Sequence, residues 1–165
     1  GDQGNAGDGG GRVAHQDKAG TPGTATITGS AINFADTAIF ADSGPIGTAG
    51  PGITLTNDTI ANTQKDGINS FDTPIGVNGN TTITTAGSHG IIASFFSLPN
   101  CPSGACERLT VDHVGITGTG KEVIVANGLA SQPATINRAT ISNGETYGIR
   151  LVGTDTLTMT YIPMT

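Results

Sequence analysis

The residues best suited to chemistry in this sequence recur at one position of an internal repeat. Aligning successive repeats places Asp66, His89, Lys121 and Tyr147 one above another, and Arg150 follows Tyr147 by three residues. A carboxylate can act as a general acid or base, and a basic side chain beside Ca²⁺ can abstract a proton α to a carboxyl group. A stacked Asp, His and Lys with a nearby Arg could serve either general acid–base catalysis or Ca²⁺-assisted proton abstraction.

The position of these residues depends on a repeat that is marked by Thr-x-Thr triplets. Complete triplets occupy residues 26–28, 54–56 and 82–84, and weaker copies occupy 110–112, 135–137 and 156–158. Their central residues lie 28, 28, 28, 25 and 21 positions apart, a period too long for a hairpin and typical of one solenoid turn. Strand alternation sends the central side chains inward. The expected first core stack is Ile27, Leu55, Ile83, Val111, Ile136 and Leu157.

Two further columns of aliphatic residues follow the triplets. The second column lies five positions on, at Ile32, Ile60, Ile116, Ile141 and Ile162, and Ser88 stands at its place in the third turn. Because five is an odd interval, a bend must intervene at corner formers such as Asn57 and Asp58. The third column is Ile39, Ile68, Ile91, Val123 and Ile149.

These columns predict an all-β coil of about six turns over residues 21–165, with about three short parallel strands per turn. An antiparallel sandwich is the competing fold, since it also has short strands with frequent turn signals. It gives no reason for a pattern that returns every 21 to 28 residues.

Residues 1–20 are Gly-rich and polar and predict a flexible leader or linker, or else the end of a longer collagen-like stalk. The sequence begins at Gly1, so we expect either a processed mature chain or an excised fragment. Cys101 and Cys106 flank Pro-Ser-Gly-Ala, which favours a small disulfide-closed loop typical of an exported protein. Two free thiols are the alternative.

The composition bears on the partners of the chain. The net charge of −6 with only seven Lys and Arg residues argues against nucleic acid. No run approaches the roughly 18 apolar residues of a membrane span. No spacing typical of a metal site is present, because a structural zinc needs about four ligands.

Two stretches resemble a known family. The run Leu-Thr-Asn-Asp-Thr-Ile-Ala-Asn from Leu55 with its later Asp-Gly-Ile, and Ala-Thr-Ile-Asn-Arg-Ala-Thr-Ile-Ser-Asn from Ala134 with Tyr-Gly-Ile-Arg-Leu, look like right-handed parallel β-helix repeats of the pectin-lyase-like superfamily. The resemblance covers roughly residues 24 to 165. It implies a right-handed parallel β-helix, whereas the activities of that superfamily range from pectin-degrading lyases and hydrolases to phage tailspikes, adhesins and autotransporter passengers.

The resemblance also allows a comparison with polygalacturonase-type hydrolases, which carry Asn-Thr-Asp, Asp-Asp, Gly-His-Gly and Arg-Ile-Lys motifs. Here the nearest strings are Asn62-Thr63-Gln64, Ser88-His89-Gly90 and Ile149-Arg150-Leu151, and no Asp-Asp pair exists. We therefore expect no catalytic residues. If the chain is nevertheless a polysaccharide lyase or hydrolase, the candidates are Asp66, His89, Lys121 and Arg150, with Ca²⁺ as the cofactor of a lyase.

Two outward surfaces are candidates for binding. Regular Thr ladders resemble the ice-binding face of some antifreeze β-helices, which makes the complete triplets candidate binding residues. The residues concerned are Thr26, Thr28, Thr54, Thr56, Thr82 and Thr84. The residues after the third column predict an outer apolar stripe at Phe40, Ile92 and Ile124, covered either by the loop from Phe95 to Glu107 or by another chain.

We therefore expect an extracellular or cell-surface rod segment, structural or adhesive, of a larger exported protein or fibre. The expected partner is a cell-surface or glycan receptor, or further copies of the chain associated end to end or laterally, and we expect no cofactor. The alternatives are an enzyme acting on extracellular glycans and an ice-binding module.

Overall fold

The computed structural model describes residues 13–16, 25–42, 52–95, 109–128, 134–153 and 157–163. Within these ranges all regular structure is β, in short strands of the kind that Thr, Ile and Val favour. None of the described residues forms a helix that is long and apolar enough to cross a membrane.

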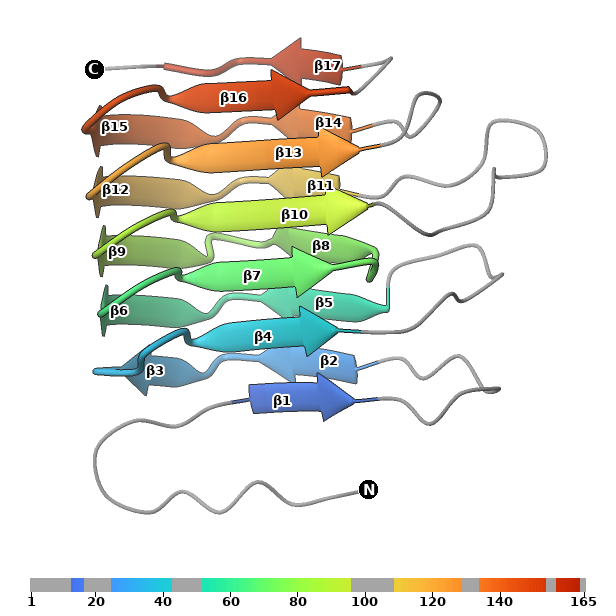
Figure 1. Ribbon diagram of the computed structural model, residues 1–165, viewed down its shortest axis with the longest axis vertical. Helices are drawn as coiled ribbons and strands as arrows, with labels where there is room; N and C mark the ends of the chain where they lie inside the picture. Colours follow the sequence, from blue (N-terminus) through green and yellow to red (C-terminus); the bar gives the residue numbers. More distant parts are fainter. Residues whose placement is uncertain are drawn as a thin grey trace, which may run out of the picture.

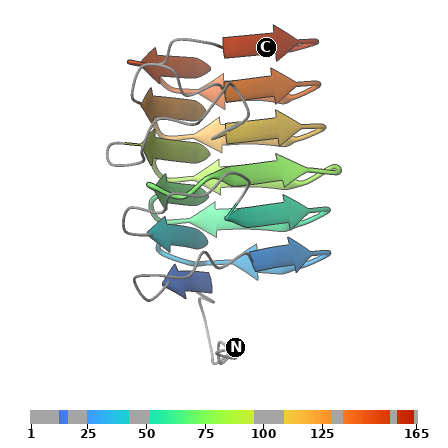
Figure 2. The same cartoon turned by 90° about the vertical axis from the view of Figure 1, so that its right-hand side faces the viewer.

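The strands form three sheets, here named A, B and C (Figures 1 and 2). Sheet A contains β1 (Val13–Gln16), β4 (Ile39–Asp42), β7 (Ile68–Phe71), β10 (Ile91–Phe95), β13 (Ile124–Gly128) and β16 (Ile149–Val152). Sheet B contains β2 (Ala25–Thr28), β5 (Ile53–Thr56), β8 (Ile75–Asn78), β11 (Leu109–Asp112), β14 (Ala134–Asn137) and β17 (Leu157–Thr160). Sheet C contains β3 (Ala31–Asn33), β6 (Thr59–Thr63), β9 (Thr82–Ala86), β12 (Gly115–Thr119) and β15 (Thr140–Gly144).

All strand pairs in these sheets are parallel, and the chain visits sheets B, C and A in turn as it winds along the axis. The prediction of an all-β parallel solenoid is confirmed. Complete coils of three strands run β2 to β4, β5 to β7, β8 to β10, β11 to β13 and β14 to β16, fewer than the predicted number of turns. Strand β1 pairs with β4 although it lies within the range 1–20 predicted as a leader. The rest of that range lies outside the described residues.

The inward stack of sheet B differs from the prediction at two positions. It consists of Ile27, Leu55, Val77, Val111, Ile136 and Met159. Val77 replaces Ile83 because the connection from β7 to β8 spans only residues 72–74, whereas residues 43–52 join β4 to β5. The third complete Thr-x-Thr triplet therefore belongs to the following sheet. In the last turn Met159 takes the position predicted for Leu157, which pairs with Ala134.

The predictions for the stacks of sheets C and A each require one correction as well. Ile83 fills the third position of the sheet C stack, which the sequence assigns to Ser88, so that this stack is complete. Its members are Ile32, Ile60, Ile83, Ile116 and Ile141. In sheet A, Ile124 rather than Val123 pairs with Ile91 and Ile149.

The predicted bend between sheets B and C is a left-handed backbone conformation. Asn57 has φ 58°, and each later turn has at least one residue of positive φ at this corner. Asp58, which follows Asn57, is buried and joins neighbouring turns. Its Oδ1 accepts a hydrogen bond from the Ser30 N–H at 2.7 Å, and its own N–H donates to Thr81 Oγ1 at 3.2 Å. These hydrogen bonds satisfy the buried polar groups of Asp58 and hold the corner in register with the neighbouring turns.

A second left-handed position follows each strand of sheet C or interrupts it. Phe34, Asn62, Thr85, Gly118 and Asn143 all have positive φ there. Asn and Gly adopt this conformation readily, whereas Thr85, with φ 56°, is β-branched and strained. The two corners give each turn a fixed shape and bring the residues before sheet A into a column.

Candidate functional site

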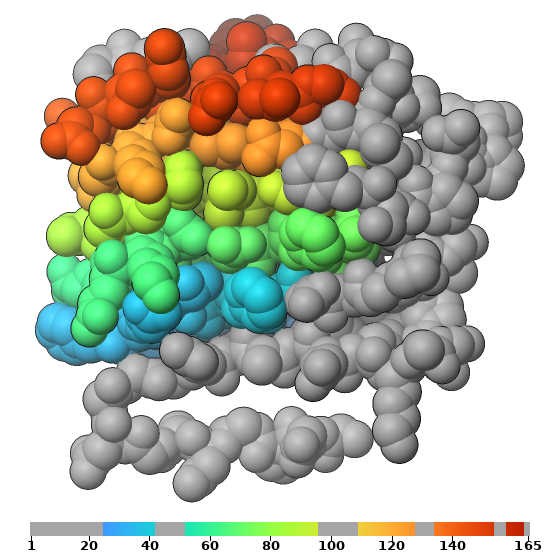
Figure 3. Space-filling view, in the orientation of Figure 1, coloured from blue at the N-terminus to red at the C-terminus, as the bar shows by residue number. Residues whose placement is uncertain are grey.

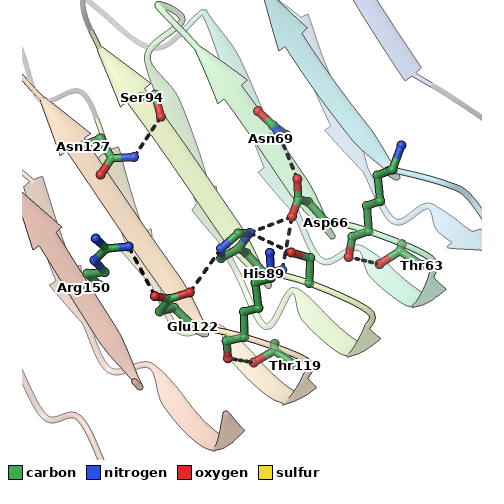
Figure 4. A network of polar contacts seen from close by, with 12 residues as sticks. Thr63, Asp66, Asn69, His89, Ser94, Thr119, Glu122, Asn127 and Arg150 are labelled. Carbon is green, nitrogen blue, oxygen red and sulfur yellow. Dashed lines mark hydrogen bonds and ion pairs between the residues drawn. The ribbon is translucent and has the colours of Figure 1, made fainter. Parts of the chain in front are cut away.

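Three ionisable side chains form a column at the corner before sheet A (Figure 4). Asp66, His89 and Glu122 each lie two residues before an inward isoleucine of β7, β10 and β13. Backbone bonds hold the corner in register, since Gly67 N–H donates to His89 O at 2.9 Å and Val123 N–H donates to Tyr147 O at 3.0 Å. The fold therefore places one side chain per turn at the same position.

The imidazole of His89 lies between the two carboxylates. Its Nδ1 is 2.9 Å from Asp66 Oδ1, and its Nε2 is 3.2 Å from Glu122 Oε2. The backbone N–H of His89 also donates to Asp66 Oδ1, at 3.1 Å. All three side chains are largely buried, with exposed fractions of 15% for His89, 11% for Asp66 and 10% for Glu122.

The outer ends of the column are bound by side chains of sheet A. Asn69 Nδ2 donates to Asp66 Oδ2 at 2.8 Å, and Arg150 Nη1 lies 3.4 Å from Glu122 Oε1. The pKa of Glu122 is held below its ordinary value, chiefly by a hydrogen bond from its own backbone N–H. Burial opposes this shift, and the charges of His89 and Arg150 and a hydrogen bond from His89 add to it.

The structure thus joins three of the four candidate catalytic residues, Asp66, His89 and Arg150, into one network. The fourth, Lys121, is exposed and lies one residue from the column, which Glu122 occupies instead. Tyr147 is in the column position of the next turn but is exposed. The missed signal was the string Glu-Val-Ile at 122–124, which matches Asp-Gly-Ile at 66–68 and His-Gly-Ile at 89–91.

The geometry favours a structural role for His89, in which it links neighbouring turns, over a role as a catalytic acid or base. A catalytic histidine needs a ring nitrogen within hydrogen-bond reach of its substrate. Here both ring nitrogens of His89 face carboxylates, and Ser88 Oγ is a further neighbour of Nδ1 at 3.2 Å. Through its contacts with both carboxylates, His89 connects three successive turns. Within the described ranges, no three His, Cys, Asp or Glu side chains are grouped so that they could hold a metal ion.

A second ionic cluster lies at the corner between sheets B and C. Asp112 Oδ1 accepts hydrogen bonds from Arg138 Nη2 at 3.0 Å and Asn137 Nδ2 at 2.8 Å, and its Oδ2 lies 3.2 Å from His113 Nδ1. Burial tends to raise the pKa of Asp112, but the hydrogen bonds and charges of His113 and Arg138 outweigh it and lower the pKa. Asp112 and Asn137 of this cluster continue the outward polar row of sheet B that begins with Thr28 and Thr56.

The candidate Thr residues are divided between two faces. Thr26, Thr28, Thr54 and Thr56 point outward from sheet B, whereas Thr82 and Thr84 lie on sheet C. One outward row of sheet B contains Thr at five of its six positions, with Gly76 as the exception. The row is Thr26, Thr54, Gly76, Thr110, Thr135 and Thr158.

Figure 3 shows the outer face of sheet A. The apolar stripe predicted for this face is only partly present. Phe40 is exposed and Ile92 is half-buried, but Ile124 is 0% exposed because it belongs to the inward stack. Val125 takes the outward position beside Ile92. The prediction for Ile124 was wrong for the same reason as that for Lys121, a shift of one residue in this turn.

Cys101 and Cys106 lie outside the described residues, so their disulfide stays a prediction. Comparison of the chain with protein-family models, curated proteins and solved structures gave no significant match.

Proposed function

We propose that this chain is a structural and adhesive β-helix rod segment of an exported surface protein or fibre, related to the pectin-lyase-like superfamily. The observation that carries the proposal is the continuity of the fold along its axis. Parallel ladders run from β2 to β17 in sheet B, and fully buried aliphatic side chains such as Leu55, Val111 and Ile136 stack beneath them. Each turn is bonded to its neighbours, which is the property that a rigid spacer requires.

The adhesive part of the proposal rests on the outer face of sheet B. Its two polar rows combine Thr hydroxyls with the amides of Asn78 and Asn137 at the regular spacing of neighbouring strands, about 4.8 Å. Hydroxyl and amide groups can exchange hydrogen bonds with the hydroxyls of a glycan. The proposed partner is therefore a glycan receptor at a cell surface.

Binding of the purified chain to an array of extracellular glycans tests this proposal. We expect binding that falls at least tenfold in Thr54→Lys, because Thr54 points outward from sheet B between Thr26 and Gly76 on the neighbouring strands. Thr59→Lys is the matched control, since Thr59 is an outward threonine on sheet C. Absence of binding to any glycan, or an equal loss in both variants, contradicts the adhesive role.

A second candidate function is ice binding, favoured by the sheet B row in which five of six positions are Thr. This function predicts thermal hysteresis in the parent chain that disappears in Thr54→Lys and persists in Thr59→Lys. Hysteresis that is absent from the parent eliminates it.

The enzyme alternative has less support, because both nitrogens of His89 are engaged. We expect no cleavage of pectate, polygalacturonate or alginate, with or without Ca²⁺. Cleavage that is lost in both Asp66→Asn and Glu122→Gln would reverse this assignment.

A further inference from the structure

The last layer of the solenoid exposes side chains whose equivalents in the layers directly below are buried. Met159 is 47% exposed, whereas Ile136, Val111, Val77 and Leu55 in the same stack are each 0% exposed. Sheet A shows the same change.

In sheet A, Leu151 is 36% exposed and pairs with Ala126, which is 3% exposed. Tyr161, at the corner beyond β17, is 79% exposed. The described residues thus place a layer of exposed apolar side chains at this end of the axis.

At the opposite end of the axis, the apolar residues of the first strand of sheet B are also less buried than their equivalents in the next layer. Ala25 and Ile27 of β2 are only partly buried, although the residues with which they pair, Ile53 and Leu55, are 0% exposed. β2 reads Ala-Thr-Ile-Thr and β17 reads Leu-Thr-Met-Thr, so both strands alternate an apolar residue with an outward Thr. Placed on β17, β2 would continue both the inward stack and the Thr rows.

The order in which the chain visits the three sheets is continued when the first strands of one copy follow the last strands of another. At the last layer, β17 lies over β14 in sheet B, and Pro163 O accepts a hydrogen bond from Ile141 N–H of β15 in sheet C. The position that follows in the winding order is over β16 in sheet A. The first strand, β1, belongs to sheet A, and β2 follows it in sheet B. A translated copy therefore supplies the strands in the order that the last layer needs.

The sequences of the two end strands of sheet B contain none of the residues that usually block strand pairing. Exposed strand edges are commonly blocked by charged residues or Pro. Neither β2 nor β17 contains a charged residue or Pro.

Building on the proposed role as a rod segment, we propose that copies of this chain stack head to tail, with β2 of one copy on β17 of the next and β1 on β16. A heterologous contact of this kind does not close and produces a filament. A tail-to-tail contact would pair strands antiparallel and would break the register that buries each stack, so the partner is a second copy in the same orientation.

Sedimentation velocity over a tenfold or larger concentration range tests the contact. We expect the parent chain to form species beyond a dimer as its concentration rises. Met159→Lys and Ile27→Lys should each be monomeric alone, because each blocks one end, and an equal mixture of the two should form a dimer and nothing larger. Phe40→Lys changes an exposed apolar residue on the outer face of sheet A, in strand β4, which is paired on both sides by β1 and β7, and it should assemble like the parent.

A parent chain that stays monomeric at every concentration overturns the inference, and so does assembly of Ile27→Lys alone, which would indicate tail-to-tail contact. Circular dichroism establishes that each variant is folded. If Met159→Lys is not folded, Thr158→Lys on β17 replaces it, and if Ile27→Lys is not folded, Thr26→Lys on β2 replaces it. A monomeric parent that still binds a glycan through sheet B would refute the stacking and leave the proposed function standing.

Discussion

Truncation of Leu55 to Ala tests the core stack of sheet B quantitatively. Leu55 is 0% exposed and lies between Ile27 and Val77 on the neighbouring strands. The change removes three carbon atoms, a transfer term of about 2.4 kcal/mol at about 0.8 kcal/mol each. The hydrogen-bonded strands on both sides limit collapse around the cavity, which adds to the cost. We expect a total loss of about 3 to 5 kcal/mol in the free energy of unfolding.

Urea denaturation followed by circular dichroism measures this loss as a lower midpoint at an unchanged m-value. Ile27→Ala is the matched control at the end of the stack, where the side chain is only partly buried. We expect it to cost about half as much, since the transfer term scales with the apolar area removed from water. A Leu55→Ala variant as stable as the parent, or one that costs less than Ile27→Ala, would refute the stacking order.

Three further predictions concern strain, pH and redox state. Thr85→Asn should raise the free energy of unfolding by about 1 kcal/mol, because Asn tolerates positive φ, and Asn62→Thr should lower it by a similar amount in the same denaturation assay. Because the pKa of Glu122 is lowered on folding, its contribution to stability is present above the ordinary value of 4.5 and is lost as pH falls through the folded value. The melting temperature should therefore fall less steeply with decreasing pH in Glu122→Gln than in the parent chain. An equal slope in the two proteins would contradict this. Thiol labelling should modify Cys101 and Cys106 only after reduction, and labelling of both in the unreduced chain would exclude their disulfide.

The repeat made the fold class predictable from the sequence. An aliphatic residue at every inward position is needed to bury a stack, so Leu55, Val111 and Ile136 could be assigned correctly from the triplets around them. The corner between sheets B and C was also predictable, since Asn57 supplies the left-handed conformation that an odd interval requires.

The errors arose where connections differ in length between turns. The path from β7 to β8 is short, so a constant period of 28 assigned Ile83 to the wrong sheet. Thr-x-Thr triplets suit strands of sheets B and C equally, because both alternate inward and outward residues. The triplet alone could not distinguish the two sheets.

The candidate site shows how a shift of one residue changes the chemistry. Ile91 lies eight positions after Ile83, and Ile149 lies eight positions after Ile141. The same interval from Ile116 leads to Ile124. Counting from the corner rather than from the nearest apolar residue would have placed Glu122 in the column. A glutamate there gives a histidine between two carboxylates, whereas Lys121 suggested a catalytic base.

Paired cysteines test the register of the solenoid most directly. The structure pairs Thr59 with Thr82 in sheet C, whereas a constant period of 28 pairs Thr54 with Thr82. Neighbouring strands lie about 4.8 Å apart, a separation that a disulfide can span. With Cys101 and Cys106 replaced by Ser, we expect Thr59→Cys with Thr82→Cys to lose both free thiols on mild oxidation, and Thr54→Cys with Thr82→Cys to retain them. Cross-linking of the second pair and not of the first would contradict the solenoid register described for this chain.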